Sequence, residues 1–114
     1  MTIHTFEEIK ARQEANKLTI EIYRTLKDNK DYGFKDQLQR ASVSIMNNIA
    51  EGFERRSNKE FRQFLYIAKG SCGEVRSMLH LAESLEYISS TSVRELIIQA
   101  LQISKMLSGF IKQL

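Results

Sequence analysis

The sequence of 114 residues contains no proline and only one cysteine, Cys72. Proline is the residue that most often ends or kinks a helix, so its absence allows long, uninterrupted helices to form anywhere in the chain. A lone cysteine excludes a disulfide within the chain. No uncharged apolar run approaches the roughly 18 residues that cross a bilayer, and the start of the chain lacks the features of a secretory signal. We therefore expect a cytoplasmic protein with no membrane partner.

The residues that are present describe a folded domain. Hydrophobic residues make up 42% of the chain and charged residues 27%, with both signs mixed. This composition is typical of a globular protein, and the length allows one continuous core but not two. We predict a single domain over residues 1–114.

Apolar residues recur at three- and four-residue spacing, and strand-like alternation is absent. The pattern predicts helices over residues 5–28, 34–53 and 57–87, and a last helix from Ser92 onward. Three capping boxes support these starts: Thr5 with Glu8, Ser57 with Glu60, and Ser92 with Glu95. Short turns place consecutive helices side by side, so we predict an all-α fold, an antiparallel up-down-up-down four-helix bundle.

The apolar stripes of these helices define the expected core. They comprise Phe6, Ile9, Leu18, Ile22, Tyr23 and Leu26 in the first helix and Phe34, Leu38, Ala41, Ile45, Ile49 and Gly52 in the second. The later helices add Phe61, Leu65, Ala68, Cys72, Val75, Leu79 and Ala82, then Val93, Leu96, Ile97, Ala100, Leu101, Ser104, Leu107 and Ile111. This set predicts one core shared by four helices.

The helix over 34–53 has a second apolar face. At 100° per residue, Val43, Met46, Ala50 and Phe53 lie opposite the core stripe. A helix of a monomeric bundle needs one buried stripe, so the second favours an interface with another copy of the chain over a wide monomer core. The next helix agrees, with four apolar residues off its core stripe: Ile67, Met78, Leu81 and Leu85.

Two glycines, Gly70 and Gly73, occur inside the third predicted helix, where each costs about 1 kcal/mol relative to alanine. We expect a packing reason, namely the close approach of another helix, in preference to a hinge or a bound ligand.

Polar residues lie between the two apolar faces of the second helix. Asn47, Asn48 and Glu51 are the polar groups expected to be buried, and buried amides and carboxylates need partners. We interpret them as a structural hydrogen-bond network that sets helix or subunit register, with Arg40 or another basic residue neutralising Glu51.

The positive charge is concentrated in the middle of the chain. Residues 35–76 hold eight basic and five acidic side chains, and this difference of three equals the whole net charge of +3. The densest cluster spans the turn before the third helix, with Arg55, Arg56, Lys59 and Arg62; Arg40, Lys69 and Arg76 are weaker candidates. Such clustering favours binding of nucleic-acid phosphates, although a solvated charged turn gives the same pattern.

The sequence contains no catalytic or metal-binding pattern. A di-iron bundle needs Glu-x-x-His pairs on its helices, and one of the two histidines, His4, precedes the first predicted helix. His80 with Glu83 fits an ordinary helix-surface pair better than a pair of ligands. Cys72 lies in an apolar stripe and is interpreted as a core residue. We expect no metal, no cofactor and no enzymatic activity.

Several strings resemble a known family: Gln37-Leu-Gln-Arg-Ala-Ser-Val-Ser-Ile, Asn48-Ile-Ala-Glu-Gly-Phe53, Phe61-Arg-Gln-Phe-Leu, Ala68 and Gly70-Ser71. Phe6, Leu85-Glu-Tyr-Ile88 and Met106-Leu107 extend the likeness over nearly the whole chain. The sequence resembles the four-helix-bundle proteins encoded in bacterial 23S rRNA intervening sequences. It departs from them at Met46, where proline is common, and near Tyr32, where a Phe-Pro pair often precedes the helix. We therefore expect the second helix to lack a proline kink.

The resemblance implies a homo-oligomeric ring, commonly a pentamer, and an association with RNA, DNA or a reverse transcriptase. Two hypotheses follow. The first is a non-enzymatic homo-oligomer that binds nucleic acid through the basic residues named above. The alternative is a protein-interaction scaffold, or an accessory protein of a polymerase, whose charges serve solubility.

Overall fold

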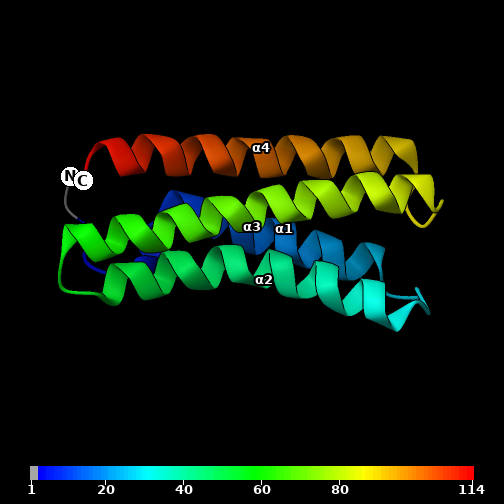
Figure 1. The fold of residues 1–114 in the computed structure, drawn as a ribbon, viewed down its shortest axis with the longest axis horizontal. Helices are drawn as coiled ribbons and strands as arrows, with labels where there is room; N and C mark the ends of the chain where they lie inside the picture. The colour runs from blue at the N-terminus through cyan, green and yellow to red at the C-terminus, as the bar shows by residue number, and fades with distance from the viewer. Residues whose placement is uncertain (1–2) are drawn as a thin grey trace.

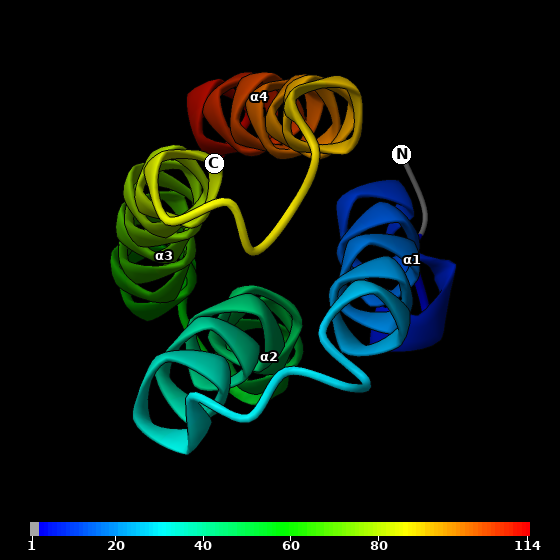
Figure 2. The same cartoon turned by 90° about the vertical axis from the view of Figure 1, so that its right-hand side faces the viewer.

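The computed structural model describes residues 3–114. Within that range the chain forms a 3-10 turn, η1 (Phe6–Glu8), and the helices α1 (Lys10–Thr25), α2 (Tyr32–Glu54), α3 (Asn58–Ser84) and α4 (Ser90–Lys112). Each helix runs antiparallel to the next, and the four surround one axis (Figures 1 and 2). The predicted antiparallel four-helix bundle is confirmed.

The starts of α2 and α3 follow from capping residues. The Ser57 hydroxyl accepts a hydrogen bond from the Glu60 backbone N–H (3.1 Å), which confirms Ser57 as the cap of α3. The Glu60 carboxylate accepts from the Ser57 hydroxyl (3.2 Å) and not from the backbone N–H that a full capping box uses. The Asp31 carboxylate caps α2 by accepting from the Phe34 N–H (3.2 Å). This cap starts α2 two residues before the predicted position.

The first helix does not run unbroken from Thr5. The Glu8 carboxylate accepts from the backbone N–H groups of His4 and Thr5 (2.7 and 2.8 Å), which closes η1. Ile9 then has extended backbone, with φ −74° and ψ 117°, and α1 begins only at Lys10. The break turns the Ile9 side chain into the core, where it is 1% exposed.

The last turn also differs from the sequence prediction. The helix α3 ends at Ser84 and not at residue 87, and Glu86 takes the left-handed conformation with φ 59°. Ser89 then caps α4 by accepting from the Ser92 N–H (3.2 Å). The predicted cap at Ser92 is wrong, because Ser89 supplies a hydroxyl three residues earlier and leaves Ser92 inside the first turn of α4.

All four helices and Ile9 contribute buried residues to one apolar cluster. Two predicted core residues are instead exposed, Tyr23 (45%) and Leu101 (42%). Ile103 is buried although it was not predicted, and Met78 is buried although it was expected off the core. Ile67, Leu81 and Leu85 are exposed as expected. Across residues 3–114, no helix combines the length and apolarity that a bilayer crossing requires.

The helices α2 and α3 approach each other closely at Gly52. A Cβ on this residue would lie 2.6 Å from the Cβ of Phe64, so only glycine fits. By contrast, a Cβ on Gly70 would meet no atom within 4 Å, and one on Gly73 would meet only the Arg76 guanidinium, at 3.9 Å. The packing reason expected for Gly70 and Gly73 is therefore wrong within this chain.

Candidate nucleic-acid interface

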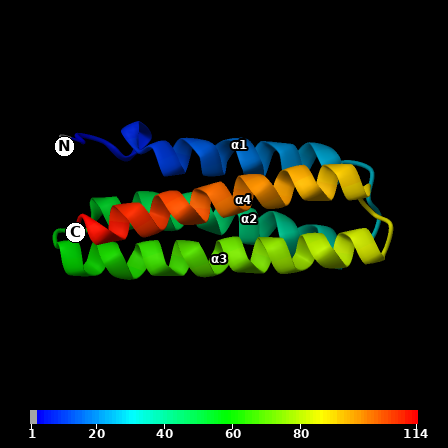
Figure 3. The ribbon, with the colours of Figure 1, turned by 90° about the horizontal axis from the view of Figure 1, so that it is seen from above.

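The basic cluster lies at one end of the bundle, at the turn between α2 and α3. Arg55 and Arg56 follow the last residue of α2, while Lys59 and Arg62 belong to the first two turns of α3. Ile3 and Leu114 line a pocket at this same end of the bundle, and Figures 1 and 3 show the carboxyl end of α4 there. Residues distant in sequence therefore border the cluster.

Two of the predicted phosphate-binding arginines are held by carboxylates of their own helix. Arg55 Nη2 lies 2.9 Å from Glu51 Oε1, and its guanidinium stands 4.9 Å from the centre of the Phe64 ring. Arg40 Nε lies 2.8 Å from Asp36 Oδ2. Both pairs are exposed, so each contributes under about 1 kcal/mol and can be exchanged for another anion.

Arg62 is half-buried, and its Nη1 donates a hydrogen bond of 2.6 Å to the carbonyl oxygen of Leu114. Its role in this structure is to tie α3 to the last residues that follow α4. Lys69 and Arg76 are also half-buried and lie further along α3, away from the cluster.

Arg56 and Lys59 differ from the other basic residues of the cluster. Both are exposed, and neither forms an ion pair with any residue in 3–114. They lie on either side of the cap of α3, where the helix dipole adds partial positive charge. This end of the bundle therefore presents two free cations and the amino end of a long helix.

An aromatic cluster lies beside these cations. The ring of Phe61 meets Phe53 at 5.9 Å and Phe110 at 5.2 Å between centroids, both edge to face. A shallow pocket of about 260 Å³ opens over the three rings, and Ile3 and Leu114 complete its apolar part. Its polar rim comes from the turn, namely Arg55, Arg56, Ser57 and Asn58.

The sequence predicted the basic residues on the rim of this pocket, but it did not predict that apolar residues from both ends of the sequence would line its floor. Phe110, Leu114 and Ile3 come from the two ends of the sequence, and no local spacing connects them to the basic turn. The up-down-up-down topology could have indicated it, because it returns the carboxyl end of α4 to the α2–α3 turn.

Two of the four predicted interface residues, Val43 and Ala50, are half-buried on the outer face of α2. The prediction is wrong for Met46 and Phe53, because both pack against the core of their own chain. Whether a second copy covers this face stays a prediction.

The predicted polar network is only partly assembled in the single chain. Asn47 and Glu51 are exposed, so their expected burial does not occur within this chain. Asn48 is half-buried, and its Nδ2 donates to the carbonyl and hydroxyl oxygens of Ser44 (2.8 and 2.9 Å). The Ser44 hydroxyl in turn lies 2.9 Å from that of Ser71, which joins α2 to α3.

A second shallow pocket, of about 400 Å³, collects residues of the outer α2 face that were predicted separately. Arg40, Val43 and all three residues of the predicted polar network line it, together with Ser44 and with Tyr23 of α1. The exposed Tyr23 side chain therefore belongs to this surface and not to the core.

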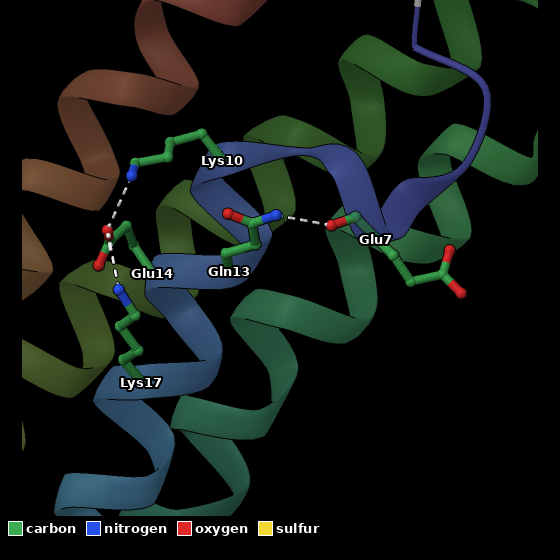
Figure 4. A network of polar contacts seen from close by, with 5 residues as sticks. All are labelled: Glu7, Lys10, Gln13, Glu14 and Lys17. Atoms are coloured by element: carbon green, nitrogen blue, oxygen red, sulfur yellow. Dashed lines mark hydrogen bonds and ion pairs between the residues drawn. The ribbon is translucent and has the colours of Figure 1, made fainter.

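Some of the remaining charged residues are paired within their own helix. On α1, Glu14 lies between Lys10 and Lys17 at 3.5 and 3.6 Å, and the Gln13 amide donates to the Glu7 carbonyl (Figure 4). Within residues 3–114 no group of three metal-ligating side chains comes together. Cys72 is fully buried, and desolvation raises the pKa of its thiol to about 11, so it stays protonated at neutral pH.

These features define a four-helix bundle with a basic, aromatic-lined end. A model of the 23S rRNA-intervening sequence protein family matches residues 7–109. The chain therefore belongs to this family. A similar solved structure is a protein with unknown function from the S23 ribosomal protein family of Bacteroides thetaiotaomicron, which is 25% identical with a TM-score of 0.83. The match covers 90% of this chain and 98% of that one. No curated protein matches the sequence.

Proposed function

We propose that this protein is a non-enzymatic, homo-oligomeric module that binds nucleic acid at the end of the bundle formed by the α2–α3 turn. The observation that carries the proposal is the pair Arg56 and Lys59, both exposed and without an ion-pair partner in 3–114, beside the amino end of α3. Free cations at a helix amino terminus attract phosphate through both full and partial charges.

Neighbouring contacts support the same reading. Arg55 is held in place by Glu51 and Phe64, yet its ion pair is exposed and exchangeable for phosphate. The description of the family names a 23S rRNA intervening sequence, which is consistent with an RNA-related role.

Self-association is part of the proposal because a single patch of this size carries little charge. A symmetric assembly repeats the patch, and linked weak sites bind a polymer much more tightly than one site does. The half-buried outer face of α2, with Val43 and Ala50, is the proposed interface between copies.

The binding test is fluorescence anisotropy of labelled RNA and DNA strands over a range of salt concentrations. The double variant Arg56→Ala/Lys59→Ala should lower affinity about tenfold at low salt and reduce the salt slope by about one for each lost phosphate contact. The matched control is Lys30→Ala/Arg94→Ala, which removes two exposed cations from the opposite end of the bundle. Absence of binding at low salt, or equal losses in both variants, would contradict the proposal.

The assembly is tested by light scattering on the purified protein. We expect a mass that is a multiple of 13.2 kDa and that falls to this value in the variant Val43→Glu/Ala50→Glu. The control is Gln63→Glu/Gln102→Glu, which adds the same charge at exposed sites on α3 and α4. A wild-type mass of one chain would overturn the oligomeric part of the proposal.

A second candidate function is a protein-interaction scaffold. It is favoured by the exposed apolar residues Ile67, Leu81 and Leu85 on α3, which are 45–52% exposed. Salt distinguishes the two functions, since phosphate contacts weaken steeply with ionic strength whereas an apolar interface does not.

A further inference from the structure

We infer that the pocket over Phe53, Phe61 and Phe110 receives an unpaired base, so that the protein binds single-stranded nucleic acid in preference to a duplex. This inference rests on the proposed function, because the same end of the bundle must first hold the phosphates. It names the group that occupies the space between the basic rim and the three rings.

The chemistry of the pocket matches that of a nucleotide. Aromatic rings form its floor, and two guanidinium groups, Arg55 and Arg56, stand on its rim. A nucleotide has the complementary arrangement, with a flat apolar base joined to an anionic phosphate. Proteins that bind single strands combine these two elements, a basic track and aromatic side chains against which bases pack.

The pocket is also small. A volume of about 260 Å³ is below the roughly 300–1,000 Å³ of pockets that enclose a drug-sized molecule. The space therefore suits one ring system and not an extended ligand. A base inside a duplex cannot enter it without leaving its stack, which costs a few kcal/mol.

The rim of the pocket also carries an amide without a partner in the described part of the chain. Asn58 is exposed at the first position of α3, and its side chain makes no hydrogen bond with any residue in 3–114. An amide offers both donors and an acceptor, which is what the edge of an unpaired base requires. The Ser57 hydroxyl, in contrast, is already used by Glu60.

Arg62 shapes this pocket without lining it. Its hydrogen bond to the Leu114 carbonyl holds Leu114 against α3, where that residue forms part of the apolar wall. Arg62 is therefore a positioning residue for the pocket, and we assign phosphate contact to Arg56 and Lys59.

The experiment compares anisotropy of four labelled probes at low salt: a short single-stranded DNA, the same strand with adjacent abasic sites, its perfect duplex, and the RNA of the same sequence. We expect the abasic strand to bind roughly 5- to 150-fold more weakly than the intact strand, because each base–aromatic contact contributes that much. The duplex should also bind more weakly, and the ratio of RNA to DNA affinity identifies which polymer is preferred.

The variant is Phe110→Leu, which keeps an apolar side chain but removes one ring, and the control is Phe6→Leu, a half-buried ring outside the pocket. Phe110→Leu should abolish most of the difference between intact and abasic strands, while Phe6→Leu should leave it unchanged; thermal unfolding verifies that both fold. Equal binding of intact and abasic strands would overturn this inference and leave the proposed function standing. Failure of every probe to bind would overturn both.

Discussion

Gly52 on α2 and Phe64 on α3 approach so closely that a methyl group on the glycine would lie 2.6 Å from the phenylalanine Cβ. The nearest atom is the first carbon of a side chain, so a rotamer change cannot relieve the overlap and the helices must separate. We predict that Gly52→Ala lowers the free energy of unfolding by about 1–2 kcal/mol, since overpacking costs more than the helix propensity gained. Urea denaturation measures this, and a stabilised Gly52→Ala variant would contradict the close contact.

Gly70, on α3, has open space around it where Gly52 has a close contact. It is exposed within α3, and a Cβ there would meet nothing within 4 Å. Gly70→Ala should raise the free energy of unfolding by about 0.5–1 kcal/mol through helix propensity alone. If the variant loses stability at a concentration where the protein is oligomeric but not where it is monomeric, a second copy packs on this site.

The start of α4 can be tested with two serines. Ser89 accepts the capping hydrogen bond, whereas Ser92 lies in the first turn. Ser89→Ala should therefore cost about 1 kcal/mol, and Ser92→Ala should cost clearly less. The reverse order in urea denaturation would restore the start predicted from the Ser92–Glu95 spacing.

A hydrogen bond at the far end of the bundle predicts a pH dependence. The Tyr87 hydroxyl donates to Asp31 Oδ2 at 2.7 Å, which lowers the pKa of Asp31 below its ordinary value near 3.8. Because the pKa of Asp31 is lower in the folded than in the unfolded protein, its ionised carboxylate stabilises the folded state at pH values above the ordinary pKa. This contribution is lost as the pH falls through the pKa of the folded state. The stability gap between wild type and Tyr87→Phe should therefore be present at pH 7 and shrink below about pH 4.

The exposed Tyr66 supplies the control for that experiment, because its hydroxyl makes no hydrogen bond within residues 3–114. Tyr66→Phe should leave the stability and its pH dependence unchanged. A gap for Tyr87→Phe that is constant from pH 7 to pH 2 would show that the Asp31 contact does not contribute.

The thiol of Cys72 gives a fifth prediction. It is fully buried, and desolvation raises its pKa to about 11. A thiol reagent at pH 8 should therefore modify the folded protein far more slowly than the protein in denaturant, since only the thiolate reacts and only opening exposes it. Equal rates in the two states would contradict the burial.

The helices were predictable because each is long and its apolar period is strong. Ser57 with Glu60 marked the start of α3 correctly, since no competing hydroxyl precedes it nearby. Ser89 to Ser92 offered several caps in a row, and sequence alone does not rank them. The break at Ile9 was missed because a 3-10 turn and a first helical turn carry the same cap signal.

Of the candidate site, only the cluster of basic residues could be predicted from the sequence. The turn from Arg55 to Lys59 is visible in the sequence, but which arginines are already paired depends on side-chain geometry. Tyr23 and Leu101 occupy positions near the edge of their apolar stripes, where a small rotation of a helix decides between core and surface. The aromatic floor required the packing of α4 on α3 and could not be read from local spacing.

The short turns between antiparallel neighbours also set how fast this chain reaches its native state. Each of the first three helices packs on the next one in sequence, and the pairing of α1 with α4 closes the bundle across distant segments. Helical bundles built from such local pairings fold in roughly microseconds to milliseconds. With no proline in the sequence, no slow isomerisation phase should follow, so the folding of each chain should be complete within the first second, before any slower association of copies.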